Sequence, residues 1–316
     1  MNARAVSVLR WFDSGAGQPP RADEESSAIR PARCVPFVLI HLGCLGVLWV
    51  GWSPVAGVVA LAAYLVRMFA ITGFYHRYFS HRSFSTGRLL QFGGAFLGAS
   101  AAQRGPLWWA AHHRNHHRHS DRAGDLHSPV HDGFWRSHCG WFLLDRNFHA
   151  DRARVPDLAR YPELLWMDRL DGIPPLLFAV GCWALGSWLA TVQPSLGTSG
   201  PQLLVWGFFV STTVLYHGTF TINSLAHRFG WRAYDTPDQS RNNLWLALIT
   251  LGEGWHNNHH YHPGSARQGF RQGEIDVTYG VLRLLQAMGL VWNVHEVPER
   301  VLAAAQPRRR RRRRRS

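Results

Sequence analysis

Residues 55–81 read VAGVVALAAYLVRMFAITGFYHRYFSH, a long apolar stretch that ends in two histidines. As an α-helix, its apolar part 55–75 would measure about 30 Å, close to the thickness of the hydrocarbon core of a membrane. We therefore expect a membrane-spanning helix that delivers His76 and His81 to one membrane surface. Arg67 lies inside this span, where a charge is costly. It must either snorkel to the headgroups or face a polar interior, and the sequence leaves both open.

Three further apolar stretches, 36–51, 173–192 and 201–222, have comparable lengths. Only residues 52–54 separate the first two spans, and a short uncharged linker separates the last two. The predicted fold class is therefore an all-α membrane protein, with four transmembrane helices in two hairpins and a helical cytosolic cap. Two buried hairpins of a large soluble bundle are the alternative, less favoured because such helices are usually shorter and apolar on one face. The short apolar stretch 89–102 is expected to form an interfacial or re-entrant helix.

The 316-residue chain carries 34 basic and 20 acidic residues, a formal charge of +14, and every basic residue is arginine. Eight arginines form the run 308–315, so the charge is a poor argument for nucleic acid as a partner, and none is expected. Arginine is absent from both hairpin turns, which places the termini and the cap in the cytoplasm. The complete lack of lysine points to a GC-rich bacterial genome, and hence to the bacterial inner membrane.

Four cysteines without a Cys-x2-Cys pair indicate neither a disulfide framework nor a cysteine zinc site.

The expected organisation has three parts. Residues 1–33 are polar and would form a disordered cytosolic tail, and residues 301–316 would form an Arg-rich disordered tail drawn to anionic lipid headgroups. Residues 34–300 would form the functional domain, whose cap consists of 76–172 and 223–300.

Three histidine clusters account for many of the 19 histidines. They read His-x4-His at 76–81, and His-x2-His-His at 113–117 and at 256–260, while a fourth element reads Asn-x3-His at 223–227. Two spans separate the first two clusters from the third, so all lie on the same side of the membrane. Imidazoles three or four residues apart share a helix face and can aim at one point, whereas the pair five apart covers a wider arc.

The number of imidazoles favours two metal ions, because nine ligands exceed the four of a tetrahedral zinc site. Imidazole binds iron, copper, nickel and zinc alike, so the ligand type leaves the metal open. The cap is therefore predicted to hold a di-metal site. The nine candidate ligands are His76, His81, His113, His116, His117, His227, His256, His259 and His260.

Carboxylates near the clusters are expected to accept the second N–H of the ligating imidazoles, as Asp121, Asp125 and Glu253 could do. Glu253 also forms Glu-x2-His with His256, the motif of carboxylate-bridged di-iron bundles. That rival architecture needs a second such motif and two further glutamates, and the sequence contains no second copy. The other histidines are given no ligand role, and His217, inside the fourth span, is expected to make a hydrogen bond there.

The motifs together resemble those of the membrane-bound acyl-CoA desaturases of the stearoyl-CoA (delta-9) type. The matching strings are HRYFSHRSF, HRNHHRHSD, GEGWHNNHHYHP and NSLAHRFG, in the same order as in the family, and the likeness runs from about residue 36 to 295. The resemblance implies a mushroom-like fold in which the nine histidines hold two irons where the spans meet the cap. It also implies that Asn223 binds one iron through a water.

The implied reaction is the O2-dependent introduction of a cis delta-9 double bond into a saturated fatty acyl chain carried on CoA. It would use two Fe ions, O2, and electrons from a separate carrier of the ferredoxin, rubredoxin or cytochrome b5 type with its reductase. Membrane lipids are the other expected partner. Tyr64 and Met68 are candidates to close the far end of an acyl tunnel, and Arg114 and Arg146 to bind the CoA phosphates.

Two other functions remain open at this level. The first is a fatty acyl or alkane hydroxylase with a similar di-iron site, although the Asn-x3-His element favours desaturation. The second is a non-enzymatic membrane protein that binds haem or a metal, which would be expected to have paired histidines within facing spans.

Overall fold

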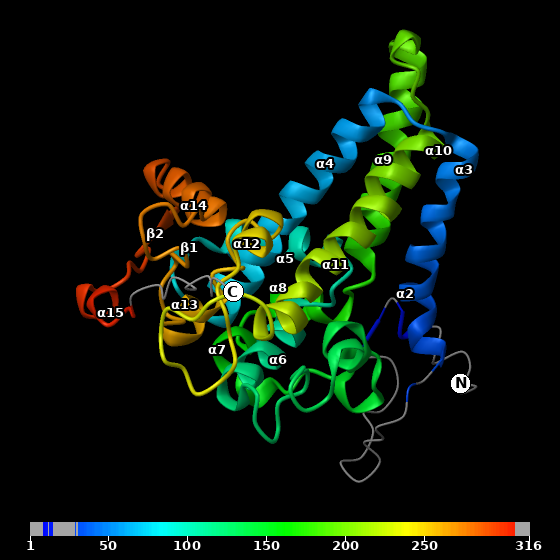
Figure 1. Cartoon of the computed structure of the whole chain (residues 1–316). Coiled ribbons are helices and arrows are strands. Elements are labelled where there is room, and N and C mark those ends of the chain that lie inside the picture. Colours follow the sequence, from blue (N-terminus) through cyan, green and yellow to red (C-terminus); the bar gives the residue numbers. More distant parts are fainter. Residues whose placement is uncertain (1–8, 12, 15–28, 30, 307–316) are drawn as a thin grey trace, which may run out of the picture.

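The computed structural model describes residues 9–11, 13–14, 29 and 31–306, and long helices project from one side of a helical cap (Figure 1). Most of the predicted tail 1–33 and the arginine run 308–315 lie outside the described residues. Among the described residues, four helices are long and apolar enough to cross a membrane: Pro31–Val50, Pro54–Ser80, Ile173–Val192 and Gly200–His227. The predicted architecture of four spans and a helical cap is confirmed.

The helices in chain order, apart from short 3-10 and π segments, are α2 (Pro31–Gly43), α3 (Val47–Val50), α4 (Pro54–Phe69), α5 (Arg88–Ser100), α6 (Pro106–His119), α7 (Pro156–Ala159), α8 (Pro162–Arg169), α9 (Ile173–Val192), α10 (Gly200–Leu203), α11 (Ser211–Ser224), α12 (Leu244–Ile249), α13 (His256–Tyr261), α14 (Val277–Ala287) and α15 (Glu299–Ala303). The strands β1 (Ser85–Thr86) and β2 (Val291–Trp292) pair antiparallel at the edge of the cap.

The two hairpin turns are tied to each other. Ser53 and Ser199 cap the helices that follow them, each accepting a backbone N–H with its hydroxyl. Ser53 Oγ also donates to Gln202 Oε1 at 2.7 Å, and Gln202 Nε2 donates to the carbonyl of Val50 at 2.9 Å. These bonds satisfy polar groups at the end of the spans far from the cap, where both hairpins meet.

Arg67 faces the interior, which settles the choice that the sequence left open. Its side chain is completely buried and donates to the carbonyl of Ser100 at 3.2 Å, to Thr212 Oγ1 at 2.7 Å and to Ser211 Oγ at 2.5 Å. The guanidinium also lies 4.4 Å from the centre of the Phe178 ring. Arg67 thus joins α4 to α5, α9 and α11 where the spans enter the cap.

The second span changes from an α-helix to a π-helix over Ala70–Ser80. In a π-helix the backbone bonds run from residue i to i+5, so residues five apart lie above one another. The amide of His81 donates to the carbonyl of His76 at 3.2 Å, and the two ring centres are 4.9 Å apart. The sequence predicted that the two rings would be spread over a wider arc than an i, i+4 pair. This prediction is wrong, because the π-helix brings both rings to the same side of the segment.

Helix α5 corresponds to the predicted interfacial stretch and packs tightly on this π-helical segment. A Cβ atom at Gly94 would lie 2.2 Å from the Phe74 ring, and one at Gly98 would lie 2.1 Å from the Tyr75 ring. Leu89, on the opposite face, is 87% exposed. The small residues of α5 are thus explained by a close helix contact.

His217 makes the hydrogen bonds expected of a polar group in the fourth span. Its Nε2 lies 3.2 Å from His41 Nε2, and its Nδ1 lies 3.0 Å from His138 Nε2. These three rings form a chain away from the clusters described next.

Candidate metal centre

The nine histidines come from four elements that meet below the spans. The end of the π-helical segment supplies His76 and His81, and α6 supplies three rings from its last two turns. The 3-10 turn Leu225–His227, which ends the fourth span, supplies His227, and α13 supplies three more rings. Figure 1 shows α6, α11 and α13 converging in the cap.

The rings divide into two groups whose nitrogens lie within 4.8 Å of one another. In the first group, His259 Nε2 lies 2.9 Å from both His76 Nε2 and His117 Nε2, and His81 Nε2 lies 2.8 Å from His113 Nε2. The first group consists of His76, His81, His113, His117 and His259; the second consists of His116, His227, His256 and His260.

The second group is more deeply buried than the first. His116, His227 and His256 are each only 2% exposed. His227 Nε2 lies 3.0 Å from His256 Nε2, and the buried His260 Nε2 has no hydrogen-bond partner among the described residues. A buried nitrogen that faces other imidazoles and has no hydrogen-bond partner fits the role of a metal ligand.

Four carboxylates fix the orientation of four of these rings. Glu253 contacts His76 Nδ1, and Asp125 lies 3.0 Å from His116 Nδ1. Asp121 lies 2.8 Å from His227 Nδ1, and Asp238 lies 2.7 Å from His260 Nδ1. Because each Nδ1–H donates to a carboxylate, each neutral ring carries its lone pair on Nε2, the nitrogen that points into the group.

Three of these carboxylates were predicted from the sequence and one was missed. Asp121, Asp125 and Glu253 all reach a cluster histidine, as expected. Asp238 was missed because it lies in the loop before α12, 22 residues from its partner, where no helical spacing links the two. The only available signal was the acidic residue itself in the string DQSRNN, which belongs to the region of resemblance.

Glu253 does not support the carboxylate-bridged alternative. Its Oε1 accepts hydrogen bonds from Arg77 Nε at 3.3 Å and Nη2 at 3.0 Å, while Oε2 contacts His76 Nδ1. A carboxylate whose two oxygens are used in this way orients a histidine and leaves the metal to the imidazoles.

Burial keeps six of the nine rings neutral. Burial lowers the pKa of His113, His117 and His259 well below the usual histidine value, and neighbouring histidines lower it further. Burial alone would raise the pKa of Asp121, but the hydrogen bond and charge of His227 lower it to about 2. A neutral imidazole beside an ionised carboxylate is the form that binds a metal ion.

The spacing of the nitrogens fits metal coordination. Two nitrogens about 2.1 Å from one ion and at right angles to each other are about 3 Å apart, whereas tetrahedral angles would place them about 3.4 Å apart. The observed separations of 2.8–3.0 Å match the right-angled case. Nine imidazoles in adjoining groups of five and four therefore fit two ions.

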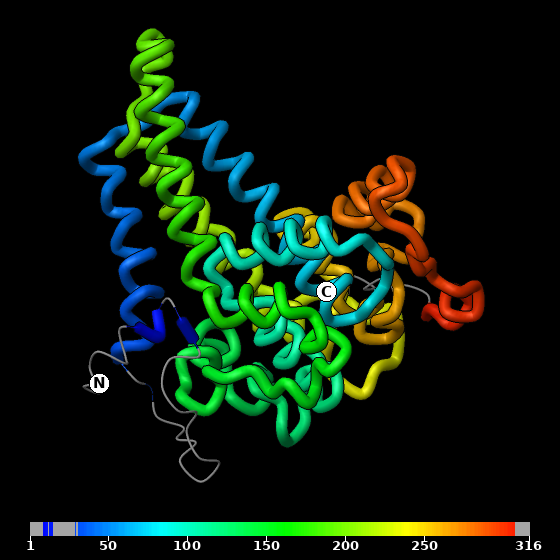
Figure 2. Tube along the Cα trace, turned by 180° about the vertical axis from the view of Figure 1, so that it is seen from behind, coloured from blue at the N-terminus to red at the C-terminus, as the bar shows by residue number. Residues whose placement is uncertain are grey.

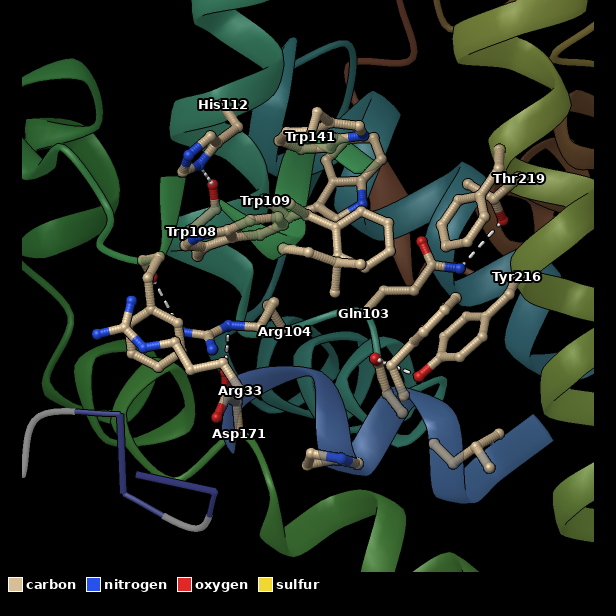
Figure 3. Close-up of a pocket in the computed structure, with 18 of the residues that line it drawn as sticks. Arg33, Gln103, Arg104, Trp108, Trp109, His112, Trp141, Asp171, Tyr216 and Thr219 are labelled. Atoms are coloured by element: carbon tan, nitrogen blue, oxygen red, sulfur yellow. Dashed lines mark hydrogen bonds and ion pairs between the residues drawn. The ribbon is translucent and has the colours of Figure 1, made fainter. Parts of the chain in front are cut away.

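A cavity of about 310 Å³ reaches the first group at His113. Figure 3 shows Trp109 and Trp141 on one side of it and Tyr216 and Thr219 of α11 on the other. At its inner end it is lined by His113 and Asn223. A second cavity of about 40 Å³ shares Trp109, His113, Thr219 and Asn223 with the first and is also lined by Met68, His76, His116 and His256. The apolar space thus passes the histidines and continues beyond them.

Of the two predicted tunnel residues, Met68 lines this space and Tyr64 does not. Met68 is fully buried and lines the smaller cavity. Tyr64 lies one turn further away, lines neither cavity and donates its hydroxyl to the carbonyl of Ile249. Asn223, the predicted water-mediated ligand, lies in the last turn of α11 and lines both cavities.

The two arginines proposed for CoA do not line the larger cavity. All five N–H groups of Arg114 are used within the protein, two of them on Asp157 at 2.7 and 3.0 Å and the others on backbone carbonyls. Arg114 is therefore a structural residue here, with no donor left for a phosphate. Arg146 lies in the 3-10 turn Asp145–Asn147, and its proposed role stays a prediction.

Comparison with known proteins agrees with this geometry. A profile described as fatty acid desaturase matches residues 28–272. An sn-2 palmitoyl-lipid 9-desaturase of Nostoc sp. is 34% identical over 90% of this chain and 96% of its own length. An sn-1 stearoyl-lipid 9-desaturase of Anabaena variabilis is 36% identical over 82% of this chain and 91% of its own. An acyl-CoA 5-desaturase of Anemone leveillei is 35% identical over 83% of this chain and 78% of its own.

These relatives act on acyl groups carried on lipids as well as on CoA, so they do not single out the stearoyl-CoA type suggested by the motifs. The match covers most of the chain and includes all four histidine elements. The chain belongs to the fatty acid desaturase family.

Proposed function

We propose that this protein introduces a cis double bond at the delta-9 position of a saturated fatty acyl chain, using O2 and two irons held by the nine histidines. The observation that carries the proposal is the apolar cavity that reaches the histidines at His113 and Asn223 and continues past them. A chain threaded through this space would present an internal methylene pair to the metal groups. The delta-9 position follows from the motif resemblance, and two relatives are named as 9-desaturases.

The chemistry requires a metal, because no side chain can remove hydrogen from an unactivated methylene. The overall conversion takes two hydrogens from adjacent methylenes and, with two external electrons and two protons, reduces O2 to two waters. Two ferrous ions bound by the two imidazole groups would supply the electrons and open coordination positions needed to activate O2.

The residues of this chain would orient the substrate and exclude water. Trp109 stacks on His113 at 4.9 Å between ring centres and forms one wall of both cavities, which limits the position of the acyl chain relative to the nearest ligand. Gln103 donates to Thr219 at 3.1 Å and joins the loop after α5 to α11 across the cavity. Fixing one methylene pair beside the metals selects the bond by position.

External partners complete the proposal. The two electrons would come from a separate ferredoxin, rubredoxin or cytochrome b5 type carrier with its reductase. The cap and both termini would face the cytoplasm of a bacterium whose inner membrane holds the four spans, with the arginine tail near anionic headgroups. Fatty acyl-CoA is the carrier that the motif resemblance favours, but the relatives support lipid-linked chains equally well.

Expression in a host that lacks its own desaturase tests the proposal. Gas chromatography and mass spectrometry of the total fatty acids should show a new cis delta-9 alkene, absent with His116→Ala and retained with His119→Ala. His119 lies on the same helix but outside both groups. A hydroxylated product without an alkene would show that the protein is a hydroxylase and not a desaturase. If the protein is correctly inserted and the electron donor works, but no new product appears, the proposal is overturned.

A further inference from the structure

We infer that the acyl chain enters from within the bilayer, through an opening between α2 and α9, while it is carried on a membrane glycerolipid. This inference rests on the proposed function and specifies the carrier and the route. It follows from which elements form the walls of the large cavity, and from what lies at each of its ends.

Membrane-spanning helices form part of the cavity wall. Phe37, Leu39 and Ile40 of α2 line it, as does Pro175 in the first turn of α9. Leu39 lines the cavity and is also 52% exposed, and its neighbours Val38 and Leu42 are 47% and 53% exposed. A side chain that both lines a cavity and reaches the outer surface lies at an opening, and this surface of α2 is the one that faces lipid.

The position of Leu39 suits an acyl chain. It lies six residues, about 9 Å along a helix, beyond Arg33 near the cap end of the span. A lipid with its ester near Arg33 would therefore have its first methylenes at the depth of Leu39. From there the cavity leads inward past Phe37, which stacks on Tyr216 with 5.6 Å between the ring centres.

A short N-terminal segment, described for residues 9–11 and 13–14, is shown in dark blue beside the cap end of α2 in Figure 2. Arg10 and Trp11 line the cavity, and Trp11 Nε1 donates to the carbonyl of Ala32 at 2.7 Å. Ser14 N donates to the carbonyl of Arg169 at 2.7 Å, and Arg169 pairs with Asp13 at 2.7 Å. These bonds hold the segment across the route that a water-soluble carrier would use.

Arg33 and Arg104, which line the cavity, are paired with carboxylates of the protein. Arg33 pairs with the buried Asp145, and Arg104 lies 3.1 Å from Asp171. Both guanidiniums also stack on Phe148, at 3.8 and 4.1 Å from its ring centre. The phosphates of CoA would have to compete with these carboxylates for both arginines, whereas the ester region of a glycerolipid needs no such exchange.

The test uses full-length protein in nanodiscs with a reductase and ferredoxin. One sample contains a phospholipid with a perdeuterated palmitoyl chain, and a second receives perdeuterated palmitoyl-CoA. Mass spectrometry of the intact lipid should show loss of two deuterium atoms in the first sample. Leu39→Trp should reduce this product about tenfold by blocking the opening, whereas Leu42→Trp, exposed on the same helix but outside the cavity lining, should leave it within about twofold.

A binding measurement that does not need turnover keeps the two proposals separable. A phospholipid with a diazirine in its acyl chain should label the α2 peptide around Phe37–Ile40 in metal-free protein, less in Leu39→Trp and unchanged in Leu42→Trp. Desaturation of palmitoyl-CoA but not of the lipid, or equal labelling of both variants, would overturn lateral entry. If the labelling is as expected but neither substrate is desaturated, the result counts against the proposed function and still supports the entry route.

Discussion

At the scale of single residues, the site depends on carboxylates that hold imidazoles in one tautomer. Asp238 is 4% exposed and accepts the Nδ1–H of His260, so it fixes which nitrogen faces the second group. We expect Asp238→Asn to weaken metal binding by about 10- to 100-fold, because the amide no longer attracts the imidazole proton as a carboxylate does. Metal retained per chain during titration with a chelator measures the effect. Asp235→Asn is the control, since that side chain is 90% exposed, and equal retention in both variants would contradict this role.

A second prediction for a single residue concerns Met68. It is completely buried at the far end of the smaller cavity, and its Cε lies 3.2 Å from where a Cβ at Gly218 would be. Met68→Ala should lengthen that cavity and shift the products toward acyl chains about two to four carbons longer, since each methylene needs its own space. Tyr64→Ala should shift them less, because Tyr64 lines neither cavity. Product profiles from mixed saturated chains give the answer, and an unchanged profile for both variants would remove the tunnel-end role.

At the scale of elements, the contact between α5 and the π-helical segment holds His76 and His81 in place. Gly94→Ala would push a Cβ to 2.2 Å from the Phe74 ring, so α5 must shift, and we expect a loss of about 1–3 kcal/mol in the free energy of unfolding. Gly93→Ala on the same helix meets nothing within 4 Å and should stabilise the protein by up to about 1 kcal/mol, because alanine is the better helix former. Unfolding of both variants in detergent distinguishes them, and equal stability would show that the contact is loose.

The helices also show which features of the fold could be predicted from the sequence and which could not. Hydropathy and length identified all four spans to within a few residues, and the fixed His spacing on α6 and α13 identified clusters that do converge. The π-helix over Ala70–Ser80 could not be foreseen, because its i to i+5 bonding depends on packing against α5 and α6 and has no spacing signal of its own. A tunnel was expected from the resemblance, but its walls could not be assigned, since they come from α2, α6 and α11, which are distant in sequence.

At the scale of the whole molecule, two groups of buried imidazoles make the metal-free protein sensitive to acid. Burial, and then neighbouring histidines, lowers the pKa of five of them well below the usual value: His81, His113, His117, His256 and His259. Below pH about 6.5 the unfolded chain binds protons that the folded chain does not, so stability is full above that pH and is lost as the pH falls. His116 opposes this trend, since burial lowers its pKa but the charge of Asp125 raises it above the usual value.

We therefore expect the unfolding temperature of chelator-treated protein to fall between pH about 7.5 and 5.5. Thermal unfolding in detergent at constant ionic strength measures it, with a His116→Ala variant to remove the histidine of the two groups whose pKa is raised. An unfolding temperature that stays constant, or rises, as the pH falls would show that the imidazoles are not held neutral by the fold.

The central claim is that nine imidazoles from four elements form two adjacent iron sites. Its most direct test is the iron content per chain of purified, iron-loaded protein, combined with X-ray absorption at the iron edge. The account predicts two irons per chain with nitrogen-rich coordination, and partial iron loss in both His81→Ala and His256→Ala, which remove one ligand from each group. A single metal per chain, a haem spectrum, or iron content unaffected by both substitutions would contradict it.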